Sequence, residues 1–136
     1  MRVKTDLEYL KGLMNVFLES SQPFIKISDL KNAGFDITTP QGLHHYSILI
    51  EKEYVSAFNL SRGNPEMLGY YYTLSSIESV DHALVRLTAE GIEFAQMLQE
   101  PSIYEKLKGF SQSPLNVMKD VGSDLLKAFL KKKFDL

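Results

Sequence analysis

The stretch TTPQGLHHYSILIEKEYV, residues 38–55, opens with the signals of a helix start and ends in a strand-like segment. Thr39 can accept a hydrogen bond from a free N–H, and Pro40 suits the first helical position, where no N–H is needed. Ser28 can cap a short helix over residues 29–33, just before this one. Two helices joined by a short turn, the second followed by a strand, predict a helix-turn-helix pair, and this pair constrains the fold most.

Further helices and strands are expected on both sides of this pair. The first helix should begin at Thr5, because Thr5-Asp6-Leu7-Glu8 matches a capping box, and should end at Gln22-Pro23. Later helices should start at Thr88, at Ser102, which opens a second capping box, and at Ser113-Pro114. Strands are expected where β-branched and aromatic residues gather, at 24–27, 54–60, 69–74 and 83–87.

The resulting order is helix, strand, helix, helix, strand, a long connection, strand, helix and then two further helices. This order predicts the α+β class, as a winged helix-turn-helix with a C-terminal helical extension. Residues 1–100 would form the winged-helix domain, with a long wing at 61–82. Residues 101–136 would form the extension, packed on that domain or on a second subunit.

The charge of the chain limits its possible partners. The 136 residues carry a formal net charge of −2, whereas domains that bind nucleic acid are usually basic. Lys and Arg drive such binding, because they displace the counterions of the phosphate backbone. Any DNA binding must therefore come from a local patch, or from an assembly that gathers such patches.

No segment of the sequence indicates a membrane or an oxidising compartment. No apolar run approaches the roughly 20 residues that a membrane helix requires, and MRVKTDLEYL lacks the apolar stretch of a secretory signal. The chain has no cysteine, which excludes disulfides and thiolate metal sites. We therefore expect a cytoplasmic protein without a membrane partner.

The residues that catalysis or metal binding would require are not arranged for it. The only histidines are His44, His45 and His82. Adjacent helical residues point about 100° apart, so His44 and His45 cannot easily hold one metal. The sequence has no HExxH, P-loop, GxSxG or GxGxxG motif. We expect no enzyme activity, no cofactor and no metal.

The best candidates for contact with DNA lie on the helix that starts at Thr39. If its apolar residues Leu43, Tyr46, Leu49 and Ile50 face inward, the outward side chains are Gln41, His44, His45 and Ser47. Gln can pair with adenine, Ser can bond a base edge or a phosphate, and His can donate to a phosphate. Arg62, at the expected wing tip, would suit a phosphate or minor-groove contact. The alternative is a solvated helix face with one partly buried histidine.

The last helix carries an apolar stripe that must be covered. Leu125, Phe129 and Leu130 are expected to be buried in their own domain or against a second copy. We expect a homodimer, because pairing doubles the DNA contacts of a net-acidic protein. The lysines Lys127, Lys131, Lys132 and Lys133 suit the negative end of the helix, and they could also touch DNA or an acidic partner.

Several stretches resemble one family: MRVKTDLEYLKGLM, HYSILIEKEYV, VRLTAEGIEFAQMLQEPSIYEKLKG and SPLNVMKDVGSDLLKAFLKK. They are similar to an uncharacterised phage and prophage family, the domain-of-unknown-function 2513 family. The resemblance implies a winged-helix core with a C-terminal helical tail, and it brings no catalytic residues. Leu87-Thr88 and Gly91 also recur after the wing in many bacterial winged-helix regulators. Many relatives have a glycine where Glu53 stands, so Glu53 is expected to make the turn into the strand despite its Cβ.

Two hypotheses for the function follow. In the first, the chain is a DNA-binding or regulatory winged-helix protein of a phage or prophage, with double-stranded DNA as its partner. In the second, it is a protein-interaction module on the same scaffold. The outward helix or the run Tyr70-Tyr71-Tyr72 would then dock a protein. For the tyrosines themselves a structural role is favoured, since alternate strand residues face opposite sides.

Overall fold

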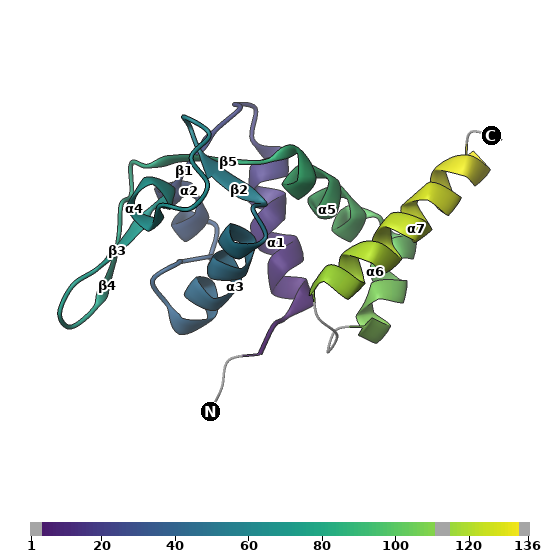
Figure 1. Cartoon of the computed structure of the whole chain (residues 1–136), viewed down its shortest axis with the longest axis horizontal. Coiled ribbons are helices and arrows are strands. Elements are labelled where there is room, and N and C mark those ends of the chain that lie inside the picture. Colours follow the sequence, from purple (N-terminus) through teal and green to yellow (C-terminus); the bar gives the residue numbers. More distant parts are fainter. Residues whose placement is uncertain (1–3, 111–114, 134–136) are drawn as a thin grey trace.

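A computed structural model describes residues 4–110 and 115–133 (Figure 1). The elements in chain order are α1 (Leu7–Glu19), β1 (Ile25–Lys26), α2 (Ile27–Asn32), α3 (Pro40–Glu51), β2 (Val55–Ala57), α4 (Pro65–Leu68), β3 (Tyr70–Tyr72), β4 (Ile77–Ser79), β5 (Leu84–Leu87), α5 (Ala89–Gln99), α6 (Pro101–Leu107), a 3-10 turn (Lys108–Phe110) and α7 (Leu115–Lys133). Helices and small antiparallel sheets together confirm the α+β class.

Three short strands form an antiparallel sheet in the order β1-β5-β2. Ile25 lies opposite Val85 on one side of β5, and Val55 lies opposite Leu87 on the other. The strands expected at 54–60 and 83–87 are therefore present, as β2 and β5, and pair with each other, although β2 ends at Ala57. Beyond it the chain turns, and Leu60 has a positive φ of 70°.

The β2–β5 connection (residues 58–83) contains α4 and a second, two-stranded sheet. Strands β3 and β4 pair antiparallel, with Tyr71 opposite Glu78, and form a hairpin that extends from one end of the molecule (Figure 1). The extra strand expected at 69–74 is confirmed by β3. The single turn of α4 was not expected. It is capped by the Asn64 side chain and ends at Gly69, whose φ of 116° is left-handed.

Two helix caps differ from the expected ones. Asp6, not Thr5, caps α1, because its carboxylate accepts from the backbone N–H groups of Glu8 and Tyr9. Glu100, not Ser102, caps α6, and its carboxylate accepts from the N–H of Ser102 at 3.4 Å. In each case the chain offers neighbouring side chains that could cap, and the sequence pattern does not distinguish between them.

The short helix α2 starts at Ile27, two residues earlier than expected, and the Asp29 carboxylate accepts from the N–H of Lys26 at 2.9 Å. The helix expected from Ser113-Pro114 is present as α7. Its expected start at those two residues lies outside the described residues.

The turn from α3 into β2 follows the expectation for Glu53, which has a positive φ of 58°. The Thr88 hydroxyl donates to the Glu53 carbonyl at 2.7 Å and also caps α5 by accepting from the N–H of Gly91. A Cβ at Gly91 would lie 2.1 Å from the Tyr54 carbonyl oxygen. Glycine is therefore required where α5 starts against this turn.

One hydrophobic core includes residues from α1 through α7. Helix α1 lies between α3 and α5 (Figure 1), and its Leu10, Leu13 and Met14 are fully buried. The first half of α7 belongs to the same core through Leu115 and Met118. No helix among the described residues combines the length and apolar composition that crossing a membrane requires.

Candidate functional site

The inner face of α3 is formed by Gly42, His45, Tyr46 and Leu49, all of which are buried. Leu43 and Ile50, which were expected to face inward, are only half-buried. The Tyr46 hydroxyl donates to the Leu68 carbonyl at 2.5 Å, and burial raises the pKa of Tyr46 far above its usual value. This bond ties α3 to α4 and so to the β2–β5 connection.

His45 does not face outward, and the expectation that it could contact DNA is wrong, because its exposed fraction is 0%. The backbone N–H of Asp6 donates to His45 Nε2 at 2.8 Å, and His45 Nδ1 lies 2.7 Å from the Gln41 carbonyl oxygen. Because Nε2 accepts this hydrogen bond, it carries no proton, so Nδ1 carries the proton and the ring is neutral. Burial lowers the pKa of His45, which favours the same form.

His44 is half-buried, and its Nε2 lies 3.1 Å from the Thr5 hydroxyl oxygen. Its ring meets that of His45 edge-on, with centroids 5.0 Å apart. The two adjacent histidines therefore hold residues 5–6 against α3. No pattern in the sequence pairs them with Thr5 and Asp6, which lie 39 residues away.

The outer face of α3 is polar but lacks positive charge. Gln41 and Glu51 are exposed, while His44, Ser47 and Ile48 are half-buried. Gln41 is thus exposed as expected, whereas His44 and Ser47 are only partly exposed. The helix contains no lysine or arginine, so it has side chains that can bond base edges without the charges that would attract a phosphate backbone.

Arg62, which was expected at the wing tip, precedes α4 and does not lie at the turn of the β3–β4 hairpin. That turn is formed by residues 73–76. One guanidinium nitrogen of Arg62 lies 3.4 Å from a Glu53 carboxylate oxygen, and both side chains are largely exposed. Ion pairs of this kind contribute little to stability.

The hairpin carries an acidic and apolar surface. We define the hairpin surface as Glu66, Tyr71, Tyr72, Leu74 and Glu78. Tyr72 is 66% exposed and Leu74 is fully exposed. A groove of about 510 Å³ lies between α4 and β3, with Glu66 and the tyrosines in its wall. The sequence held a signal for this surface, because residues 63–85 contain no lysine or arginine.

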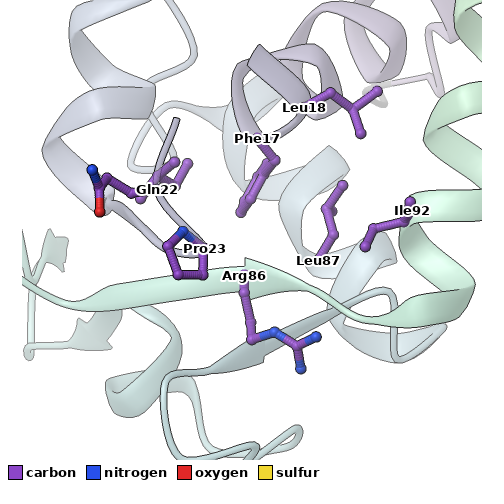
Figure 2. Close-up of a pocket in the computed structure, with 8 residues that line it drawn as sticks. Phe17, Leu18, Gln22, Pro23, Arg86, Leu87 and Ile92 are labelled. Carbon is purple, nitrogen blue, oxygen red and sulfur yellow. The ribbon is translucent and has the colours of Figure 1, made fainter. Parts of the chain in front are cut away.

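A separate pocket of about 310 Å³ lies where the end of α1 meets β5 and the start of α5 (Figure 2). Its lining residues are Phe17, Leu18, Gln22, Pro23, Ile25, Arg86, Leu87 and Ile92. Figure 2 shows Phe17 and Leu18 on one side and Arg86 on the other. Among the described residues that line the pocket, Arg86 is the only charged one, and none forms a pair of a general base and a nucleophile.

Charge is divided unevenly along the chain. Residues 1–100 contain 13 acidic side chains against eight Lys and Arg, a net −5, and residues 101–136 contain seven Lys against four acids, a net +3. The outer face of α3 and the hairpin surface thus lie in the acidic part of the chain, residues 1–100. Within residues 4–110 and 115–133, no group of three His, Cys, Asp or Glu side chains could hold a metal.

Comparison of the chain with protein-family models, curated proteins and solved structures found no match. The assignment of a function therefore depends on the geometry and charge of the three surfaces described above: the outer face of α3, the hairpin surface and the pocket beside Arg86.

Proposed function

We propose that the chain is a winged-helix regulatory protein that binds double-stranded DNA, with α3 as the reading helix and the β2–β5 connection as the wing. One observation carries this proposal: α1, β1, α2, α3, β2 and β5 follow one another in the order of a winged helix, with β5 between β1 and β2. The winged-helix class is supported by the order and pairing of these elements alone, and a fold does not establish which ligand a protein binds.

The DNA contacts that we propose come from Gln41, His44 and Ser47 on the outer face of α3. Gln41 is exposed and can pair with an adenine edge, and Ser47 can bond a base or a phosphate. His44 Nδ1 has no partner among the described residues and can donate to a phosphate. His45 has a different part in this proposal, because it holds α3 against α1.

We expect the affinity of one copy for DNA to be modest. The region that carries α3 has a net charge of −5, so the long-range attraction that most DNA-binding domains use is missing. Sequence preference would depend on the few base contacts of α3. The resemblance to a phage and prophage family supports a mobile genetic element as the source, and we expect a DNA-binding protein of such an element to act in the cytoplasm.

A direct test measures binding to random duplex DNA by electrophoretic shift and by fluorescence anisotropy, at 50 and 200 mM salt. The double variant Gln41→Ala/His44→Ala should lose on the order of 1–3 kcal/mol of binding free energy per lost base contact. Gln96→Ala, an exposed glutamine on α5, is the matched control and should bind as the unaltered protein does. No shift at either salt concentration would contradict the proposal.

A second function is favoured by the hairpin surface. Exposed tyrosine and leucine side chains beside carboxylates are typical of a protein-binding site and unsuited to a phosphate backbone. In this alternative the protein is an interaction module on a winged-helix scaffold and binds no DNA. The shift assay separates the two functions, since only the first predicts a complex with duplex DNA at low salt.

A further inference from the structure

The second half of α7 is poorly covered by its own chain. It extends past α6 at one end of the molecule (Figure 1). Leu125 and Phe129 line a groove of about 260 Å³ between α6 and α7, and Leu130 is 39% exposed. Lys127, Lys131 and Lys132 are exposed and make no ion pair among the described residues. This end of α7 is therefore a basic, partly apolar surface.

The hairpin surface lies at the opposite end of the long axis (Figure 1). It has the complementary character, because Glu66 lines the same groove as Tyr71 and Tyr72, and Glu78 lies opposite Tyr71 in the hairpin. Neither carboxylate makes an ion pair among the described residues. A large exposed apolar patch between charges usually marks a site of association.

We propose that the end of α7 in one copy docks on the hairpin surface of a second copy, and that two such contacts close an antiparallel dimer. The apolar side chains Phe129 and Leu130 would cover the tyrosines, while Lys127, Lys131 and Lys132 would face Glu66 and Glu78. This inference does not depend on DNA binding.

The position of the two surfaces sets the symmetry of the dimer. Because they lie at opposite ends of the molecule, copies joined in the same direction would leave an open surface at each end and form a chain. Two copies side by side in opposite directions satisfy both surfaces at once. A closed dimer then gains from two linked contacts, each of which is weak alone.

The chain cannot make this contact with itself. Helix α7 is continuous from Leu115 to Lys133, and its first half is fixed in the core by Leu115 and Met118. At Gly122 an added Cβ would lie 2.8 Å from Met97 Sδ, so this part of the helix lies close against α5. A rigid helix held in this way cannot turn back to the far end of its own molecule.

The test compares the association of charge-reversal variants by sedimentation equilibrium at 50 and 500 mM NaCl, with far-UV circular dichroism to check folding. The unaltered chain should be a dimer that weakens in high salt. Lys131→Glu/Lys132→Glu and Glu66→Lys/Glu78→Lys should each raise the dissociation constant by about ten-fold or more, because attraction becomes repulsion. Combining the four substitutions should restore the dimer. Glu19→Lys/Glu93→Lys reverses two exposed carboxylates elsewhere and should have no such effect.

Each outcome decides the proposal. A monomeric unaltered chain overturns it, and so does a dimer that tolerates both reversals. Species that grow beyond the dimer with concentration overturn the antiparallel closure. Rescue by the fourfold variant, with folding preserved, supports the contact between these two surfaces. DNA binding is scored separately by the shift assay, so failure of one proposal is distinguishable from failure of the other.

Discussion

The inner and outer faces of α3 both carry polar residues but differ strongly in burial and in hydrogen bonding. Inner residues His45 and Tyr46 are fully buried and bond Asp6 and Leu68, far away in the chain. Outer residues Gln41 and Ser47 face solvent at least in part. His44 and His45 are adjacent histidines in the sequence. His45 is buried and both of its ring nitrogens are hydrogen-bonded, whereas Nδ1 of His44 has no partner among the described residues. The rotation of a helix, and not its composition, therefore decides which polar residues can meet a partner.

The largest expected effect concerns the inner face. Tyr46→Ala removes a fully buried ring and leaves the Leu68 carbonyl without its donor. We expect the free energy of unfolding to fall by about 3–5 kcal/mol. Urea denaturation measures it, with Tyr72→Ala on the exposed hairpin as the matched control. Equal losses in the two variants would contradict the distinction between buried and exposed tyrosines.

His45→Ala should have the next largest effect. It leaves the Asp6 N–H without an acceptor and opens a space between α1 and α3. We expect a loss of about 2–3 kcal/mol in the free energy of unfolding. His44→Ala, its neighbour on the outer face, should cost less than about 1 kcal/mol. If the order of the two losses is reversed, the assignment of the inner and outer faces is wrong.

The buried position of His45 should also make the stability of the protein depend on pH. Burial holds the pKa of His45 below 6.5 in the folded chain. As pH falls through 6.5, the unfolded chain therefore binds a proton on this histidine before the folded chain does. The stabilising contribution is complete above pH 6.5 and is lost as pH falls from there towards the folded pKa. In His45→Gln the free energy of unfolding, measured by urea denaturation, should therefore depend less on pH between pH 7.5 and 5.5. Asp36, whose pKa is lowered by its hydrogen bonds to Thr38, acts only below that range.

The smallest expected effect concerns Arg62. Because its ion pair with Glu53 is exposed, Arg62→Gln should change the free energy of unfolding by less than about 0.5 kcal/mol. If the proposed DNA binding exists, the same variant should weaken it evenly across sequences and reduce its salt dependence. A loss of sequence preference in Arg62→Gln would instead indicate a base contact at this residue.

Local chemistry in the sequence was enough to predict much of the fold. Thr39 accepts from the Gly42 N–H at 3.0 Å as a helix cap, and Thr88 caps α5. These features depend on residues within a few positions of one another, so one short window of sequence contains all the relevant chemistry.

The features that could not be predicted depend on distant contacts. Thr5 and Asp6 are both good caps, and Thr5 is instead bonded to His44 across 39 residues. The outward position expected for His45 assumed that Leu43 and Ile50 would be more buried than a histidine. In the structure the Asp6 N–H supplies a buried partner that makes the histidine acceptable inside. Arg62 was misplaced because the turn of α4 was not expected.

The central place of β5 in the sheet has a consequence for synthesis on the ribosome. Its partners β1 and β2 are made first, but neither can join the sheet until residues 84–87 have been translated and released. Until then α1 and α3 have no sheet against which to bury their apolar faces. Strand pairs that cannot form until a late segment has been made slow folding, and they leave the nascent chain exposed to aggregation in the meantime. The first two thirds of this polypeptide should therefore reach their native state in one late cooperative step, and slower translation upstream of β5 should increase the demand for chaperones.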